Sequence, residues 1–247
     1  MNKTQQQTKV TFDVYRLGRM DYLEAYRLQL ELLQKRAEGI IGDSLLLMEH
    51  PPTITVGKAG KDSNILATTV ELAERGVSLY FTDRGGDVTF HGPGQLVGYP
   101  IIDLRSRDKD LYQYIENLEE VLIRTLAGFG IESGRDPSHR GVWVNDGEIV
   151  AIGLRISRWV TMHGFALNVN IDTGYFSLIN PCGFTDRGAI SMAEVLGREV
   201  DTEAVTRDLL ANFAVVFDGE LRMKSPEAIG INRNRTADNE TKTARVV

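Results

Sequence analysis

The feature that most constrains the fold is a glycine-dense run, RGGDVTFHGPGQLVGYP, over residues 84–100. Its glycines are Gly85, Gly86, Gly92, Gly94 and Gly98. Glycine lets a backbone turn with positive φ and approach a ligand closely enough to point N–H groups at it. The run therefore predicts either tight turns and a bulge in a sheet, or a loop that cradles an anion or a carbonyl group.

Polar side chains between these glycines favour the binding loop. They are Arg84, Thr89, His91 and Gln95. A histidine there can donate a hydrogen bond to a carbonyl or a phosphate, although most single histidines are structural. The glycine spacing matches neither the Walker loop nor the Rossmann fingerprint, and no clear helix follows, so glycine content alone does not indicate a nucleotide site.

A single cysteine, Cys182, lies in the segment INPCGF over residues 179–184. One cysteine cannot form an intramolecular disulfide, which is in keeping with a reducing compartment. Pro181 and Gly183 on either side predict a turn that presents the thiol at a loop tip. Two interpretations stay open here: a small buried side chain, or a nucleophile that needs a positive charge, a helix start or a base nearby.

Length and composition predict one globular domain of 247 residues, with 42% apolar and 25% charged residues. No stretch approaches the roughly 20 apolar residues that cross a bilayer, and the N-terminus lacks the apolar core of a signal peptide. We therefore predict a cytoplasmic protein without a membrane partner. The net charge of −6 argues against nucleic acid as the main partner. Four scattered histidines and one cysteine have no metal-ligand spacing, so we expect no metal.

Hydrophobic periodicity predicts helices at residues 22–37, 70–76, 111–129, 191–197 and 202–217. Strands are predicted at residues 10–18, 44–50, 53–57, 77–83, 96–104, 141–144, 149–156 and 162–170. Asp146-Gly147 suits a turn with positive φ and predicts a hairpin there. This pattern indicates the α+β class, with a mixed, largely antiparallel sheet flanked by helices.

The predicted domain occupies residues 10–224, between a flexible N-terminus at 1–9 and a disordered tail at 225–247. Both flanking segments are polar, and the tail is rich in Asn, Thr, Arg and Glu.

Five segments in order resemble the lipoyl(octanoyl) transferase family: RGGDVTFHGPGQ, GVWV, AIGLRI, MHGFALNVN and INPCGF. The resemblance runs from about residue 45 to about residue 184 and implies the fold of biotin and lipoate protein ligases. It implies an acyltransferase of lipoate biosynthesis and protein lipoylation that needs no cofactor. Its implied partners are octanoyl-acyl carrier protein and the lipoyl domains of 2-oxo acid dehydrogenases and the glycine cleavage H protein.

The resemblance also implies a two-step mechanism in which Cys182 takes the octanoyl group as a thioester, which a lipoyl-domain lysine then attacks. The implied substrate-binding residues form three groups: Arg84, Gly85, Gly86, Asp87, Val88, Thr89, Phe90 and His91; Ala151, Ile152 and Gly153; and Gly164, Phe165 and Ala166. Small residues in these groups leave room for an acyl chain, and exposed N–H groups there can form an oxyanion hole.

The chain departs from the family at Glu148, which stands where the family has a lysine that favours the thiolate. No lysine occurs between Lys109 and Lys224. A carboxylate disfavours a neighbouring thiolate by like-charge repulsion. Three interpretations follow: Glu148 is a general base, His163 supplies the base in a Cys–His pair, or the chain is a catalytically impaired acyl-carrier-protein binder.

An ATP-dependent lipoate or biotin protein ligase is the alternative enzyme of this fold. Such a ligase activates a free acid as an adenylate and uses a lysine near the acyl site, so Cys182 and the missing lysine weigh against it. An acidic acyl carrier needs a basic docking surface. The candidates are Arg155, Arg158, Arg187, Lys58 and Lys61.

Overall fold

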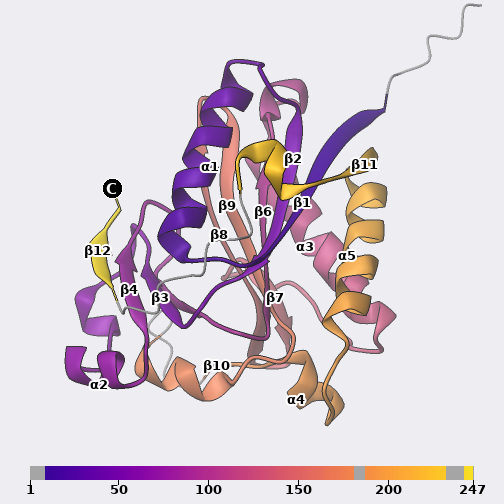
Figure 1. The fold of residues 1–247 in the computed structure, drawn as a ribbon. Coiled ribbons are helices and arrows are strands. Elements are labelled where there is room, and N and C mark those ends of the chain that lie inside the picture. Colours follow the sequence, from indigo (N-terminus) through magenta and orange to yellow (C-terminus); the bar gives the residue numbers. More distant parts are fainter. Residues whose placement is uncertain (1–8, 181–186, 232–241, 247) are drawn as a thin grey trace, which may run out of the picture.

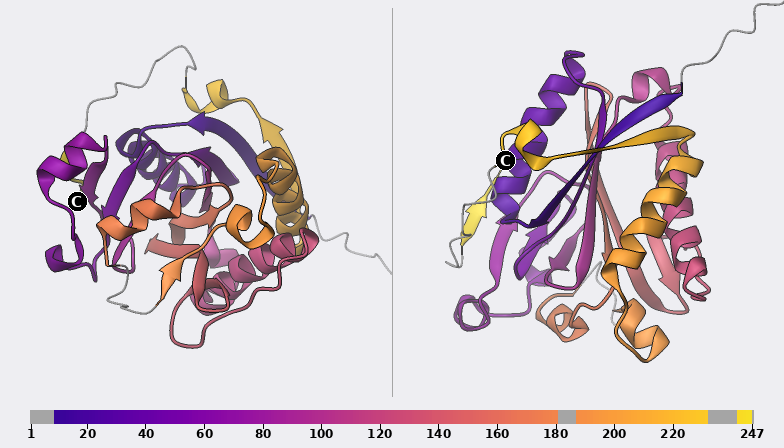
Figure 2. Two further views of the ribbon diagram at one scale, coloured as in Figure 1. Left: turned by 90° about the horizontal axis from the view of Figure 1, so that it is seen from below. Right: turned by 45° about the vertical axis from the view of Figure 1, so that its right-hand side comes forward.

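The computed structural model describes residues 9–180, 187–231 and 242–246. Its core is an eight-stranded sheet, with a separate four-stranded sheet beside it. Helix α1 covers one face of the large sheet, and α3 and α5 cover the other (Figures 1 and 2). This arrangement confirms the predicted α+β class and mixed sheet.

Mixed pairing in the large sheet comes from strands that are distant in the sequence. Its order is β10 (Gly188–Ala189), β8 (Gly147–Ser157), β9 (Val160–Asn168), β6 (Gln95–Ile101), β2 (Asp43–Glu49), β1 (Val10–Arg19) and β11 (Gly219–Lys224), with β7 (Gly141–Val144) also paired to β8. Strand β1 is parallel to both its neighbours and β10 is parallel to β8, whereas the other pairs are antiparallel. The predicted β7–β8 hairpin is confirmed, and Asn145 in its turn has φ +51°.

The small sheet was not predicted as a separate unit. Its order is β12 (Thr243–Arg245), β4 (Ser78–Phe81), β3 (Thr53–Val56) and β5 (Val88–His91). Pro51 and Pro52 interrupt the chain between β2 and β3, so the chain leaves one sheet and enters the other. Strand β5 lies inside the glycine run, where the surrounding glycines hide its short alternating pattern.

Part of the tail predicted to be disordered, residues 225–247, has regular structure. In the predicted tail, the described residues include a 3₁₀ helix at Pro226–Ile229 and strand β12, which pairs in parallel with β4. Residues 1–8 of the predicted flexible N-terminus lie outside the described residues, and the 10–224 boundary stays a prediction.

The α-helices are α1 (Tyr22–Ala37), α2 (Thr69–Glu74), α3 (Leu111–Gly128), α4 (Met192–Leu196) and α5 (Thr202–Val216). Each of them begins where a polar side chain caps its first turn: an aspartate for α1, α3 and α5, a threonine for α2 and a serine for α4. Asp21 accepts hydrogen bonds from the first turn of α1, and Asp110 does the same for α3, so each helix starts at a fixed residue. In the described parts of the chain, no helix is long and apolar enough to cross a membrane.

Strands β6 and β9 approach each other so closely that two positions require glycine. A Cβ atom on Gly164 would lie 2.1 Å from the carbonyl oxygen of Gly98. A Cβ atom on Gly98 would lie 2.1 Å from the ring of Phe165. These contacts place the predicted 164–166 group against the middle of the large sheet.

Candidate functional site

The predicted site groups meet at one cavity of about 470 Å³. Its lining includes Glu148 and every predicted substrate-binding residue except Phe90. Phe90 is 1% exposed and stacks on Tyr175 in the small-sheet core, with ring centroids 4.9 Å apart. The glycine run therefore does form part of a cavity wall, but Phe90 does not line that cavity.

The side chain of Arg84 holds the 84–87 loop in shape. Its Nη2 donates to the carbonyl oxygens of Thr55 at 2.6 Å and Asp87 at 2.7 Å. Its Nε donates to Thr55 Oγ1 at 3.1 Å, and its Nη1 donates to the carbonyl oxygen of Gly85 at 3.0 Å. One buried guanidinium thus closes the loop on itself and ties it to β3.

Backbone hydrogen bonds also connect the 84–87 loop to β8 and to the loop that follows β3. The N–H of Gly85 donates to the carbonyl oxygen of Leu154 on β8 at 2.7 Å. On the other side, the N–H groups of Lys58 and Ala59 donate to carbonyl oxygens of the loop at 2.9 and 3.1 Å. The Gly85 amide is therefore not available as an oxyanion donor.

Beyond Ala151, strand β8 has no β7 partner along this cavity. Beyond its pairing with β7, which ends at Ala151, the strand has β9 on one side and the Gly85 hydrogen bond on the other. Consecutive residues 151–154 all line the cavity. Because successive side chains of a strand point to opposite faces, the cavity reaches both faces of the sheet around this edge.

Glu148 lies at the start of β8, next to β7 and β10. Burial raises the pKa of its carboxyl group to about 8, and the charge of Arg84 opposes that shift only in part. Most Glu148 side chains are therefore protonated at neutral pH. A neutral carboxyl group does not repel a thiolate, so the like-charge conflict expected from the sequence is largely removed.

Cys182 lies outside the described residues, but both flanks of its segment are placed. The N–H of Asn180 donates to the carbonyl oxygen of Asn64 at 2.8 Å. On the other flank, Arg187 forms an ion pair with Asp136 at 2.6 Å, and β10 at 188–189 pairs with β8 at 147–148. After residues 181–186, the next described strand therefore pairs with β8 at Glu148.

His163 is the other titratable group considered as a base. Its Nε2 donates to Asp83 Oδ1 at 3.0 Å, and burial lowers its pKa. His163 is paired with Leu154, six residues along β8 from Glu148. This register separates His163 from the end of the cavity where β10 pairs with β8.

The comparisons with known proteins identify the family. The family model of the lipoyl protein ligase A/B catalytic domain matches residues 21–214. The chain belongs to this family.

Members of this family with high identity are octanoyltransferases. The octanoyltransferase of Rubrobacter xylanophilus is 49% identical over 215 residues, which cover 86% of this chain and 96% of that protein. The octanoyltransferase of Koribacter versatilis is 50% identical over 209 residues, which cover 83% of each chain.

Solved structures of low identity share the fold. A putative lipoate protein ligase from T. acidophilum, solved with lipoic acid, has a TM-score of 0.67 at 13% identity and covers 90% of this chain and 93% of its own. Biotin protein ligase from Aquifex aeolicus, in complex with biotin and ATP, has a TM-score of 0.52 at 14% identity and covers 83% of this chain and 70% of its own. The predicted fold family is confirmed.

Ten further residues among those described line the cavity and were not predicted as site residues. These lining residues are Tyr22, Tyr99, Leu111, Ile115, Ser138, His139, Arg140, Trp143, Leu154 and Ile156. They come from separate elements, and their hydrophobic spacing indicated only helices and strands. Trp143 in the GVWV segment, and Leu154 and Ile156 in the AIGLRI segment, could have been predicted, because both segments were recognised as resembling the family.

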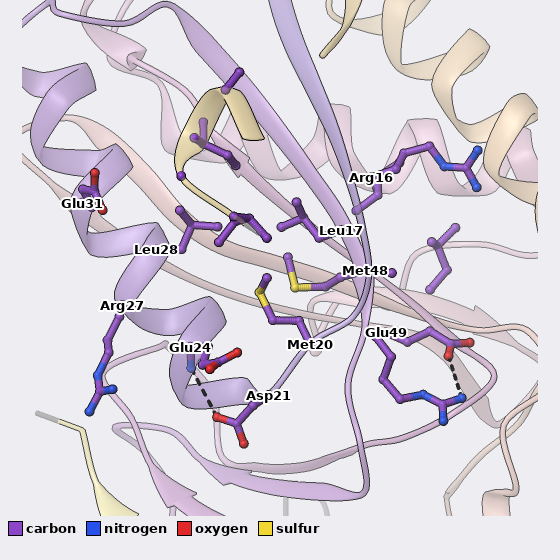
Figure 3. Close-up of a pocket in the computed structure, with 18 of the residues that line it drawn as sticks. Arg16, Leu17, Met20, Asp21, Glu24, Arg27, Leu28, Glu31, Met48 and Glu49 are labelled. Atoms are coloured by element: carbon purple, nitrogen blue, oxygen red, sulfur yellow. Dashed lines mark hydrogen bonds and ion pairs between the residues drawn. The ribbon is translucent and has the colours of Figure 1, made fainter. Parts of the chain in front are cut away.

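A larger groove of about 1850 Å³ lies between β1, α1 and α5 and contains none of the predicted site residues. Figure 3 shows Met20, Leu28 and Met48 gathered at its apolar part, with charged side chains of both signs around them. Arg19 is paired with Glu49 there at 3.2 Å. This balance of charge favours no ligand class.

Proposed function

We propose that this chain transfers an octanoyl group from octanoyl-acyl carrier protein to a lysine of a lipoyl domain through a thioester on Cys182. The chain is an acyltransferase of lipoate biosynthesis and protein lipoylation, as its octanoyltransferase relatives indicate. The observation that carries the cysteine mechanism is the acyl-sized cavity beside Glu148, where β10, the next described strand after Cys182, pairs with β8.

The chemistry balances in two steps without an external oxidant or ATP. The sulfur of Cys182 attacks the carbonyl carbon, the bond to the carrier's thiol breaks, and that thiol leaves with a proton. The lysine ε-amine then attacks the Cys182 thioester, an amide bond forms, and an amine proton returns to the cysteine sulfur. The first step exchanges one thioester for another, so its free-energy change is small, and the second step yields the more stable amide.

Glu148 is the proton acceptor in this proposal. A free cysteine thiol has a pKa of about 8.5, close to the pKa of about 8 of Glu148. Proton transfer between groups of matched pKa costs little free energy, and a base with a pKa near the working pH is effective. Glu148 also stands at the position of the family lysine, whereas His163 lies beside Leu154, six residues further along β8.

Two of the five basic residues predicted to form the docking surface are placed to contact an acyl carrier protein. Arg155 and Arg187 form ion pairs with Asp83 and Asp136, and Arg158 lies in the β8–β9 turn, at the far end of β8 from Glu148. Lys58 and Lys61 are exposed on the loop that is hydrogen-bonded to the 84–87 loop. We assign these two lysines to the acidic acyl carrier.

Intact mass after incubation with octanoyl-acyl carrier protein tests the proposal. Without ATP, the protein should gain about 126 Da, the mass of one octanoyl group in place of a hydrogen, and Cys182→Ser should gain no labile adduct. A lipoyl domain added afterwards should remove the adduct and take up the same mass. Transfer that occurs only from free octanoate with ATP would instead identify a ligase, and no adduct under either condition would identify a carrier binder.

Glu148→Gln is expected to lower the rate of Cys182 acylation by about 100-fold, because glutamine cannot accept the thiol proton. In the unsubstituted protein the rate should rise with pH and level off above about 8, as Glu148 ionises. Stopped-flow or quenched acylation over a pH series measures both effects. A Glu148→Gln variant with an unchanged rate and pH profile would rule out Glu148 as the base.

The Glu148→Gln substitution is also expected to change the pH dependence of folding stability. Because burial raises the pKa of Glu148, protonation stabilises the folded state at low pH, and this contribution is lost as the pH rises through about 8. Glutamine carries no charge at any pH. Glu148→Gln should therefore gain stability relative to the unsubstituted protein between about pH 5 and pH 9, which melting curves at both values will show.

A further inference from the structure

His163 has a backbone conformation that a strand residue does not normally adopt. Its φ is +58°, in the left-handed region, although it lies within β9. The other non-glycine residues with positive φ in the described ranges lie outside strands, in loops and turns. A strained residue persists only where its surroundings hold it, and such residues gather at functional sites.

The left-handed backbone changes the face to which His163 points. Alternation along β9 places His163 on the same face as Phe165, which packs in the core under α3 and α5. The His163 ring instead lies 5.9 Å from the ring of Tyr26 and 6.3 Å from that of Tyr99, both in the core under α1. The conformation thus turns the imidazole to the α1 side of the sheet, into the cavity that it lines.

Several contacts hold the imidazole in this position. Besides the hydrogen bond from Nε2 to Asp83, the backbone N–H of His163 donates to Gln29 Oε1 on α1 at 2.7 Å. Asp83 is itself fixed, because Tyr26 donates to its Oδ2 at 3.1 Å and Arg155 pairs with it at 2.5 Å. The ring is therefore a rigid wall of the cavity.

The imidazole of His163 narrows the cavity from one side. Along β8 the lining runs from Glu148 through residues 151–154 to Ile156, two residues beyond Leu154, the partner of His163. Six residues of β8 from Glu148 to Leu154 correspond to about 20 Å of strand, and an extended octanoyl chain spans about 9 Å with C–C bonds near 1.5 Å. An octanoyl chain therefore fits on the Glu148 side of the ring, whereas a longer chain comes closer to it.

We propose that His163 is a specificity-determining residue whose imidazole, aimed by its left-handed backbone and held by Asp83, narrows the acyl cavity and favours octanoyl over longer acyl chains. This inference rests on the proposed function. Tyr99 stands beside the ring and also lines the cavity. A longer chain reaches a ring held in place by a charged partner, so it binds less well.

The test compares octanoyl and dodecanoyl carrier proteins as donors for His163→Gly. Glycine removes the ring and adopts the same φ without strain, so the fold is retained. The ratio of kcat/KM for dodecanoyl to that for octanoyl should rise at least 10-fold. Asn145→Gly, which replaces another left-handed residue in the β7–β8 turn, is the matched control and should leave the ratio unchanged.

Two further measurements distinguish a failure of the proposed His163 role from a failure of the proposed function. Asp83→Asn retains the ring but weakens its anchor, and should shift the same ratio about threefold in the same direction. An unchanged ratio in both variants, with octanoyl transfer intact, would overturn the role of His163 alone. If the unsubstituted protein transfers no octanoyl group, the proposed function fails. Calorimetry then compares the binding of dodecanoate and octanoate to the unsubstituted protein and to His163→Gly. A preference that shifts towards dodecanoate in the variant supports the role of His163, and an unchanged preference overturns it.

Discussion

Replacing Arg84 by methionine is expected to lower kcat/KM for octanoyl transfer roughly 100-fold and to destabilise the fold by about 3 kcal/mol. The guanidinium of Arg84 is buried and donates to Thr55, Gly85 and Asp87. Methionine fills a similar volume but leaves buried carbonyl oxygens without donors. The 84–87 loop then loses its shape, and with it one wall of the acyl cavity.

Arg84→Lys distinguishes geometry from charge. One ammonium group cannot reach the acceptors that a planar guanidinium spans, so lysine should behave nearly like methionine. Arg75→Met is the surface control, because Arg75 is exposed at the end of α2 and forms an ion pair with Glu71 at 3.2 Å. Denaturant melts and steady-state kinetics measure the two effects. Full activity in Arg84→Lys would show that only the positive charge matters.

Gly164→Ala is expected to destabilise the protein by about 3 kcal/mol, because its methyl group would overlap the backbone of the neighbouring strand. The added Cβ would lie 2.1 Å from the carbonyl oxygen of Gly98 and 2.7 Å from Pro100 Cδ. Backbone on β6 cannot move away without breaking its pairing with β2 and β9. For a chain of this size the loss corresponds to a melting temperature lower by roughly 6–12 °C.

Gly42→Ala is the matched control for this substitution. A Cβ atom at Gly42 meets no atom within 4 Å, so the change should alter the melting temperature by at most about 2 °C. Scanning calorimetry of both variants beside the unsubstituted protein makes the comparison. Equal melting temperatures for the two alanine variants would show that β6 and β9 are not as close as the structure places them.

Local features of the chain were predictable because they depend on neighbouring residues. Helix α1 begins at Tyr22 and ends at Ala37 as its periodicity predicts, since an apolar stripe and a capping Asp21 are sequence-local. Arg84 and the glycines beside it were recognised as a binding loop for the same reason. The placement of strand β5 was not predictable from the sequence, because the pairing of β5 with β3 decides it.

The sequence by itself determined which residue types are available for the site: a lone Cys182, a glycine loop and Glu148 in place of lysine. Tertiary structure decided what those residues do. Burial at the start of β8 gives Glu148 a pKa of about 8, and no local pattern contains that information because desolvation depends on every element packed around the carboxyl group. The direction of His163 likewise depends on Asp83 and Gln29, which only the fold brings to it.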